Sequence, residues 1–274
     1  MTVVDVAVLA IIQGLAELLP VSSSAHVVVA EKLMGLDPSA PEMTLLLVML
    51  HTGTMLAVIA FFWPAWQKAW FGHRAEGARI LGLLVVATVV TGVIGGGLTE
   101  LIERAIGGDV EQLFSRLDLI GPALAAVGIL ILVAGWRDRR PQASSPVGFR
   151  TSVLVGAAQG LSLPFRGFSR SGATISTAML AGVQKLEAEA FSFALAVLLT
   201  PAAIGREILR LLHARPDVGP VIMVSCFGAV CAFVAGVLAL KWLTRWLVHG
   251  RWWMFGCYCL LAAAVVLFLN RIGF

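Results

Sequence analysis

The sequence has few charged residues, with Asp, Glu, Lys and Arg together making up 13% of its 274 positions. A soluble domain carries about 25%. Hydrophobic residues account for 59% of the chain, and the mean hydropathy is +0.91. Apolar runs of about 20 residues recur along the whole length, which is the length that a helix needs to cross a bilayer. We therefore expect a polytopic membrane protein whose residues 1–274 form one membrane domain, with no soluble domain left over.

The sequence also lacks the patterns that accompany nucleic-acid binding, thiol chemistry or secretion. Its net charge is only +4 and its basic residues stand in short loops, so we interpret them as topology signals and expect no nucleic-acid partner. The four cysteines lie in apolar segments without Cys-x-x-Cys spacing, which is typical of packing residues. The N-terminus carries Asp5 where a signal peptide has basic residues, and its apolar run contains Gln13 and Glu17, so we expect no cleavable signal peptide.

Two pairs of short apolar segments are separated by polar turns. The first pair covers 3–19 and 25–35, and the second covers 150–163 and 171–184. Pro20 interrupts the first pair, and Pro164 and Gly167 interrupt the second. Each segment is too short to cross about 30 Å of hydrocarbon. Each pair is thus expected to form a re-entrant hairpin, which is tolerated at membrane depth only when it is buried in protein or faces a water-filled cavity.

Six longer apolar runs are expected to cross the membrane. They cover about 44–63, 80–98, 118–136, 188–206, 219–240 and 252–270. The fold class is therefore all-α, with six transmembrane helices and two re-entrant helical hairpins.

The distribution of Lys and Arg predicts the orientation of these spans. Lys185 and loops 64–79, 137–150 and 241–251 together carry eleven basic residues. The opposite side carries seven: Lys32, Arg104, Arg116, Arg206, Arg210, Arg215 and Arg271. Because cytoplasmic loops are enriched in Lys and Arg, the side with eleven is predicted to be cytoplasmic.

With this orientation the two hairpins enter the membrane from opposite faces. The halves, about 1–136 and 150–270, are then related by an inverted-topology repeat, and both hairpins begin with Gln-Gly-Leu, at Gln13 and at Gln159. Folds of this kind place their site near the midplane, where broken helices meet. We therefore expect the two hairpin tips to form the site.

The first tip combines an amide, a carboxylate, hydroxyls and an imidazole. Gln13 and Glu17 are four residues apart and so share a helical face. The turn hydroxyls, which can cap the helix that carries His26, are Ser22, Ser23 and Ser24. A carboxylate can act as a base or a metal ligand, a hydroxyl as a nucleophile and a histidine as a general acid.

The second tip carries an arginine among hydroxyls. Ser169 can cap a helix that begins near Ser171, with Arg170 at its mouth. A helix N-terminus with free N–H groups binds anions, and the planar guanidinium pairs phosphate oxygens in a bidentate way. The two tips together therefore predict a phosphate site, in which Glu17 would repel the ligand unless a divalent cation lies between them.

Each of these residues also has a structural interpretation. Turn serines are most often caps, and a lone histidine on an apolar face is often a hydrogen-bonded core residue. A Glu17–Arg170 pair could be a purely structural ion pair, although a buried arginine costs at least about 2.5–3.5 kcal/mol in a bilayer. Convergence of all these groups on two related tips favours a functional site.

The two tip sequences resemble the motifs of a known family. The first is similar to (Glu/Gln)-x-x-x-Glu followed by Pro-Val-Ser-Ser-(Ser/Thr)-x-His, which covers Gln13 to His26 here. The second resembles Pro-Gly-x-Ser-Arg-Ser-x-x-Thr, which ends at Thr174 here. These are signatures of the integral-membrane undecaprenyl-diphosphate phosphatases of bacteria, which are associated with bacitracin resistance. The resemblance covers essentially the whole chain.

The resemblance implies hydrolysis of undecaprenyl diphosphate to the monophosphate in the bacterial inner membrane, which recycles the lipid carrier of cell-wall synthesis. Glu17, Ser23, His26 and Arg170 would be catalytic: an activating carboxylate, a nucleophile, an acid/base and a phosphate binder. Further substrate-binding residues would be Gln13, Ser22, Ser24, Ser169, Ser171, Thr174 and His51. Glu17, helped by Gln13, would hold a divalent cation, Mg²⁺ or Ca²⁺. The sequence leaves a homodimer open.

Two departures from the motifs and two alternatives remain. Gln13 stands where many members have Glu, and Arg166 replaces a proline, so it could either contact phosphate or point outward. His51 could line the site or pack by bonding to a threonine. Inverted repeats are also the plan of carriers, so the chain could instead transport undecaprenyl phosphate or another anion. The Glu17, Ser23 and His26 cluster favours catalysis, which needs these groups as transport does not.

Overall fold

The computed structural model describes residues 2–36, 41–72, 74–114, 116–138, 145–214 and 219–273. Within these ranges the regular secondary structure is helical, apart from an isolated parallel bridge between Ser145 and Val183. The α-helices are α1 (Val3–Leu18), α2 (Ser23–Leu33), α3 (Pro41–Trp66), α4 (Arg74–Ile106), α5 (Leu117–Arg137), α6 (Phe149–Ser162), α7 (Arg170–Leu180), α8 (Lys185–Ala214), α9 (Gly219–Val248) and α10 (Trp252–Arg271). A π-helix, η1 (Gln67–Phe71), follows α3, and a 3₁₀ helix, η2 (Val110–Leu113), precedes α5.

Five helical segments of the described chain are long and apolar enough to cross a membrane. They are Met43–Trp70, Arg74–Ile106, Leu117–Arg137, Ile222–Val248 and Trp252–Arg271. The chain is therefore a multi-pass membrane protein, as expected. The sixth expected span, 188–206, falls within α8, which is not among these five, so the six-span arrangement stays a prediction.

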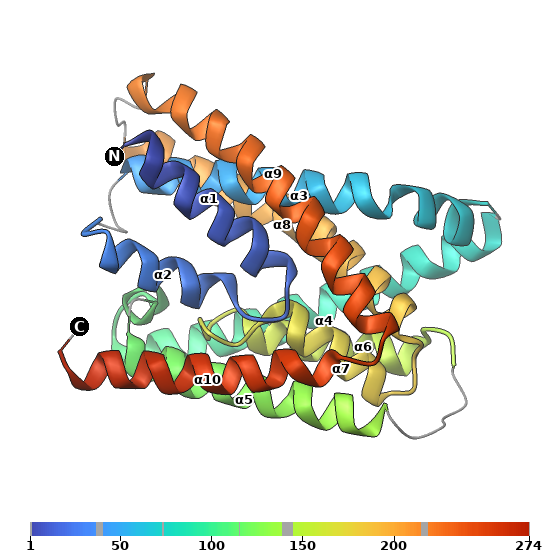
Figure 1. Ribbon diagram of the computed structural model, residues 1–274. Coiled ribbons are helices and arrows are strands. Elements are labelled where there is room, and N and C mark those ends of the chain that lie inside the picture. The colour runs from blue at the N-terminus through green and yellow to red at the C-terminus, as the bar shows by residue number, and fades with distance from the viewer. Residues whose placement is uncertain are drawn as a thin grey trace.

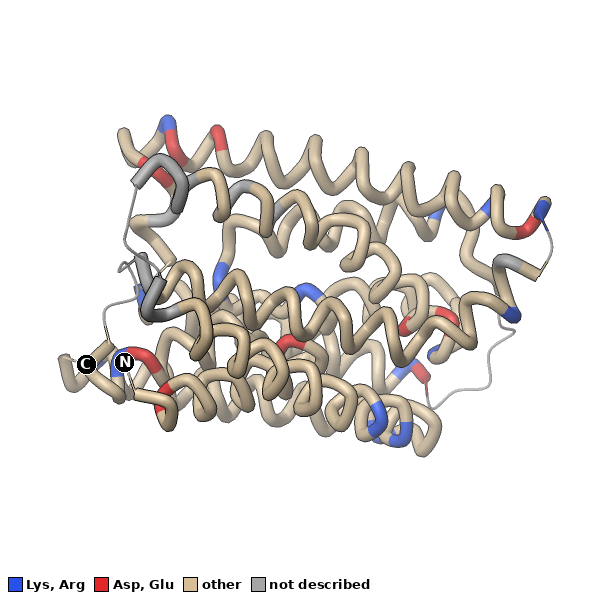
Figure 2. The backbone as a smooth tube through the Cα atoms, turned by 90° about the horizontal axis from the view of Figure 1, so that it is seen from above, with Lys and Arg blue, Asp and Glu red and all other residues tan. Residues whose placement is uncertain are grey.

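The long helices form a bundle in which charge is concentrated at the two ends. Both chain termini lie at one end, while the end of α3, the start of α4 and the turn between α9 and α10 lie at the other (Figure 1). Lys, Arg, Asp and Glu gather at these ends, and few occur midway along the bundle (Figure 2). Of the basic residues used to predict orientation, Arg139, Arg140 and Arg215 lie outside the described residues.

The two segment pairs expected to form hairpins are the helix pairs α1–α2 and α6–α7, and their re-entrant placement in the membrane stays a prediction. Thr2 and Asp5 form a reciprocal capping box that starts α1, and the helix ends just before Pro20. At 1.5 Å per residue, the 11 residues of α2 and of α7 each extend about 16 Å, roughly half the hydrocarbon thickness. Neither helix can therefore span a bilayer by itself.

The first helix of each hairpin packs closely on a long helix of the opposite half of the chain. Helix α1 lies along α9, and α6 lies along α4. A Cβ atom added to Gly14 of α1 would lie 2.6 Å from the Cβ atom of Ala235, and one added to Gly160 of α6 would lie 2.9 Å from that of Ile94. Only glycine permits this approach, which is how membrane helices gain close packing.

The second tip and α10 hold the first tip through two of its backbone carbonyl oxygens and the hydroxyl of Ser24. Ser171 donates to the carbonyl oxygen of Leu19 at 3.3 Å, and the thiol of Cys259 donates to that of Pro20 at 3.3 Å. The amide of Gly167 approaches the hydroxyl of Ser24 at 3.4 Å. The two turns consequently meet within the bundle, as Figure 1 shows, which confirms that the hairpins bring their tips together.

Candidate active site

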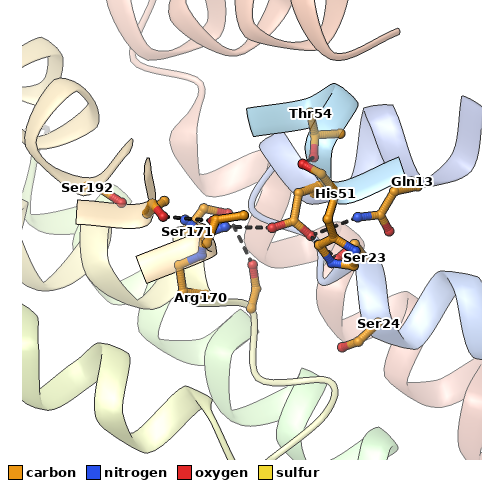
Figure 3. Close-up of polar contacts among 12 residues, drawn as sticks. Gln13, Ser23, Ser24, His51, Thr54, Arg170, Ser171 and Ser192 are labelled. Carbon is orange, nitrogen blue, oxygen red and sulfur yellow. Dashed lines mark hydrogen bonds and ion pairs between the residues drawn. The ribbon is translucent and has the colours of Figure 1, made fainter. Parts of the chain in front are cut away.

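The site is organised around the carboxylate of Glu17, which both tips contact. Its Oε1 accepts a hydrogen bond from Nη2 of Arg170 at 2.6 Å. Its Oε2 accepts from the hydroxyl of Ser23 at 2.5 Å and from Nε2 of Gln13 at 3.2 Å. Figure 3 shows these groups converging from α1, α2 and α7. The expected cluster of carboxylate, hydroxyl, amide and arginine therefore exists.

Helix periodicity places the groups of the first tip. Gln13 is buried on α1, one turn before Glu17, so its amide lies beside the carboxylate. The chain then reverses in the turn before α2, and Ser23 is the first residue of that helix. This reversal returns the Ser23 hydroxyl to Glu17, six residues earlier in the chain.

The expected capping of α2 by a serine side chain is wrong at its first position. Ser22 is the N-cap residue, but its side chain makes no capping hydrogen bond and instead pairs with the hydroxyl of Ser24 at 3.2 Å. The physical reason is its backbone: φ of Ser22 is 68°, the left-handed region that is strained for a residue other than glycine. An N-cap residue normally has an extended backbone, from which its side chain reaches the first N–H groups of the helix.

The second tip is capped as expected. Ser169 is the N-cap residue of α7, and its hydroxyl accepts from the amide of Gly172 at 3.2 Å. The hydroxyl of Thr174 is fully buried, donates to the carbonyl oxygen of Arg170 at 2.8 Å and lies 2.5 Å from the hydroxyl of Ser192 on α8. These contacts fix the first turn of α7 and hence the starting point of the Arg170 side chain.

Arg170 carries the positive charge of the second tip into the first. The side chains of Arg170 and Glu17 are 22% and 15% exposed, so their ion pair is largely shielded from solvent. Nη1 of Arg170 is buried without a hydrogen-bond partner among the described residues. An unpaired guanidinium nitrogen next to a satisfied one is suited to a further anionic oxygen.

His26 lies in the first tip, but its ring does not bond to the Glu17 cluster. Nδ1 is 2.7 Å from the carbonyl oxygen of Ser22, and Nε2 is 2.7 Å from the hydroxyl of Tyr258. Both ring nitrogens are thus engaged elsewhere, and the Ser23 hydroxyl bonds to Glu17. Sequence reasoning missed Tyr258; the one available signal was that this is the only tyrosine of the chain.

His51 and Arg166 take up positions that the sequence left open. Nε2 of His51 lies 3.9 Å from Oε2 of Glu17, and its Nδ1 bonds to the carbonyl oxygen of Leu47 at 2.8 Å. His51 therefore lines the site and is not bonded to a threonine through its ring. The guanidinium of Arg166 lies over the ring of Phe114, 4.5 Å from its centroid, in a cation–π contact.

The donor atoms fit a hard cation only if a ligand supplies part of its coordination. Within the described residues, no group of three His, Cys, Asp or Glu side chains could hold a metal ion. Glu17 offers a carboxylate and Ser23 a hydroxyl, and Gln13 can offer its amide oxygen after rotating its amide. Mg²⁺ is usually bound by one or two carboxylates together with phosphate oxygens. The residues therefore suit a cation shared with a phosphate.

Comparison with known proteins gives a consistent result along the chain. Residues 6–265 match the profile of the family described as Bacitracin resistance protein BacA. The chain is 51% identical to undecaprenyl-diphosphatase 2 of Acinetobacter baylyi, over 98% of both proteins. It is 34% identical to the undecaprenyl-diphosphatase of Rhodopirellula baltica, over 97% of this chain and 98% of the relative. It is 35% identical to the undecaprenyl-diphosphatase of Desulfosudis oleivorans, over 96% of this chain and 97% of the relative.

Proposed function

The chain belongs to the bacitracin resistance protein BacA family, and from this we propose that it hydrolyses undecaprenyl diphosphate to undecaprenyl phosphate and inorganic phosphate. The chain is thus an enzyme, a membrane-bound diphosphate hydrolase. Its activity recycles the lipid carrier of cell-wall synthesis and underlies bacitracin resistance. The relatives extend over nearly its whole length, so the comparison covers both tips.

One observation carries the chemical part of the proposal. Glu17 accepts a hydrogen bond from the Ser23 hydroxyl at 2.5 Å and from Arg170 of the opposite tip at 2.6 Å. A base, a hydroxyl nucleophile and a phosphate-binding cation therefore surround one point. A purely structural ion pair would not require a hydroxyl held against the same carboxylate.

The diphosphate is bound by charge and by backbone amides. Arg170 contributes its unpaired Nη1 to a phosphate oxygen. The N-terminus of α2, which no side chain caps, offers N–H groups and the positive end of the helix dipole. The hydroxyls of Ser22 and Ser24, paired 3.2 Å apart beside that N-terminus, supply further donors. The prenyl chain lies between helices, in contact with lipid.

Ser23 is the nucleophile and Glu17 its general base. The hydroxyl proton passes to Oε2 of Glu17 as Oγ of Ser23 bonds to the terminal phosphorus. The bond between that phosphorus and the bridging oxygen breaks in line, and undecaprenyl phosphate leaves with the electron pair. Glu17 passes that proton to the departing phosphate and is ionised again. It then takes a proton from a water molecule that attacks the phosphoserine, and returns this proton to Oγ of Ser23 as inorganic phosphate is released. Quenched reactions of a hydrolysis-slowed variant should contain phosphoserine at position 23, and its absence would favour direct attack by water.

A divalent cation, Mg²⁺ or Ca²⁺, is proposed as the cofactor. Glu17, Ser23 and the amide of Gln13 would hold it together with the substrate. Its chemistry would be to neutralise phosphate charge beside a carboxylate that otherwise repels it. Ser23 and Glu17 keep the roles given above.

We further propose the inverted-topology repeat of halves 1–136 and 150–270, with six membrane crossings. The crossing of α1 on α9 through Gly14 has its counterpart in the crossing of α6 on α4 through Gly160, which supports a pseudo-two-fold relation. The end of the bundle that carries the α9–α10 turn is assigned to the cytoplasm of the bacterial inner membrane. The site is proposed to open to the outer face.

The direct test is phosphate release from undecaprenyl diphosphate by the purified protein in detergent with added lipid, with and without EDTA. Glu17→Ala is the test variant, and Glu100→Ala is the matched control because Glu100 is an exposed residue paired with Arg104. We expect release that EDTA suppresses, that Glu17→Ala abolishes and that Glu100→Ala retains. No release from a folded, lipid-replete wild type would reject hydrolysis, and movement of undecaprenyl phosphate in liposomes would then identify a carrier.

A further inference from the structure

A tyrosine on the last helix contacts the first hairpin tip. The hydroxyl of Tyr258, on α10, lies 2.7 Å from Nε2 of His26, which is 232 positions away in sequence. The two rings stack with centroids 5.7 Å apart and an interplanar angle of 12°. Tyr258 is the only tyrosine in the chain. The mechanism described above does not use it.

The partners of His26 determine its tautomer. Nδ1 faces the carbonyl oxygen of Ser22 at 2.7 Å, and because a carbonyl can only accept, Nδ1 carries the proton. In the neutral ring Nε2 is then the acceptor, so the Tyr258 hydroxyl donates to it. The imidazole is therefore held at both ends, by a backbone oxygen of the tip and by a side chain from outside it.

The Ser22 carbonyl is part of the strained turn that places the nucleophile. Ser22 has φ of 68°, and the following residue, Ser23, bonds to Glu17 at 2.5 Å. A backbone conformation of this kind persists only when its surroundings hold it. The hydrogen bond from His26 to the Ser22 carbonyl is one such constraint, and it depends on the orientation of the imidazole ring.

Helix α10 is well placed to deliver this contact. Cys259, the next residue, is fully buried and donates its thiol to the carbonyl oxygen of Pro20 at 3.3 Å. Phe255, one turn before Tyr258, is buried and packs edge-on against Trp252. The helix also lies along α5. Tyr258 is thus attached to an element that already contacts the first tip.

We propose that Tyr258 is a positioning residue for the hydrolysis, which acts through His26 on the Ser22 turn and so on the nucleophile. This inference rests on the proposed function. Tyr258 fixes the plane and tautomer of the imidazole, His26 holds the Ser22 carbonyl, and the turn presents Ser23 to Glu17. Its main effect is expected on turnover, because the turn presents the Ser23 nucleophile to Glu17, and Arg170, the charged phosphate binder, lies on the other tip.

The test compares Tyr258→Phe, which keeps the ring and removes the hydroxyl, with His26→Ala and the double variant. Phe268→Leu on the exposed face of α10 is the control for altered lipid contact. We expect Tyr258→Phe to lower kcat about threefold to tenfold, the range that one neutral hydrogen bond supplies, with KM within about twofold. In the His26→Ala background the same substitution should change kcat by less than about 1.5-fold.

A second readout is independent of activity. In substrate-free protein labelled with ¹⁵N in its histidine rings, Tyr258→Phe should move the Nε2 resonance of His26 and leave the other histidines unchanged. If the wild type is active, three results would each overturn the positioning role alone. The first is an unaltered kcat in Tyr258→Phe, and the second is an Nε2 resonance of His26 that does not move. The third is a loss of kcat in the His26→Ala background as large as in the wild-type background. A wild type that releases no phosphate would overturn the proposed function, and the positioning role with it.

Discussion

The two hairpin tips are alike in plan and different in how each is held. In both, the second helix has 11 residues, a serine at the N-cap and a glycine with positive φ just past its end, Gly35 in the first and Gly182 in the second. Ser169 caps its helix through its own hydroxyl, whereas Ser22 does not. The second helix of the second tip is therefore capped by its own serine side chain, whereas that of the first tip is not.

The difference in capping matches a difference in the proposed roles of the two tips. Ser23 and Arg170 are the first residues of α2 and α7, so equivalent positions supply the proposed nucleophile and the proposed phosphate binder. An uncapped helix N-terminus leaves its N–H groups available to an anion. The capped second tip presents the guanidinium of Arg170 from a fixed backbone, and the uncapped first tip presents the groups that react.

The glutamines of the two Gln-Gly-Leu sequences differ in the same way. Gln13 donates to Glu17 at 3.2 Å, whereas Gln159 donates to Thr91 on α4 at 3.3 Å. Both are buried, so the same residue serves the reacting carboxylate in one half and helix packing in the other. Equivalence in sequence therefore does not imply equivalence in role.

The largest effect should come from the carboxylate of the reactive tip. Glu17→Gln keeps the shape but removes the base, and we expect kcat for phosphate release to fall at least about a hundredfold. The matched control, Glu100→Gln, changes an exposed carboxylate and should stay within about twofold. Comparable rates for Glu17→Gln and wild type would show that Glu17 is not the base.

The second-largest effect should come from Arg170 on the second tip. Arg170→Lys keeps the charge but loses the fork that bonds Glu17 through Nη2 and leaves Nη1 for phosphate, so kcat/KM should fall about tenfold to a hundredfold. The control is Arg104→Lys in the exposed pair with Glu100. Steady-state kinetics of both variants measure the loss, and near-normal turnover of Arg170→Lys would remove its proposed role.

A smaller effect should separate the two glutamines. Gln13→Glu adds a carboxylate beside Glu17, so the Mg²⁺ concentration for half-maximal activity should fall severalfold. Gln159→Glu places the same charge next to Thr91, away from the proposed cation, and should leave that concentration unchanged while lowering thermal stability. Titration of activity with Mg²⁺ tests both, and equal responses would contradict the assignment of the cation to the first tip.

The smallest effect concerns the caps. Ser169→Ala removes a capping hydroxyl, which costs about 1 kcal/mol, and should lower Tm by about 2–4 °C. Ser22→Ala removes a hydroxyl that caps nothing and should lower Tm less than Ser169→Ala does. Thermal unfolding of the two variants in the same detergent measures both Tm values. A larger loss of Tm in Ser22→Ala would contradict the conclusion that only the second tip is capped by its serine.

Sequence reasoning located the helices because apolar length and proline positions dominate a membrane fold. The span expected at 118–136 is α5, Leu117–Arg137, and the contact of Glu17 with Arg170 followed from placing two polar tips in an apolar chain. The family resemblance is confirmed by the match over residues 6–265. Strong, local signals of this kind can be read without coordinates.

Two features could not be predicted because they depend on tertiary contacts. The left-handed backbone of Ser22 is supported by His26, so local capping preference gave the wrong hydrogen bond there. Tyr258 stands inside an apolar span, where nothing in the sequence marks its partner in the first tip. Periodicity indicates which face a residue occupies, but not which distant helix will lie against it.

The central claim is that two tips, one from each half of the chain, form a single site for diphosphate hydrolysis. A double-mutant cycle with Glu17→Gln, Arg170→Gln and the double variant tests it most directly, with the rate of phosphate release from undecaprenyl diphosphate as the readout. If Glu17 and Arg170 act as a unit, the rate of the double variant should be within about tenfold of the rate of the slower single variant. A loss equal to the product of the two single losses would mean that the tips contribute independently, and would contradict the account.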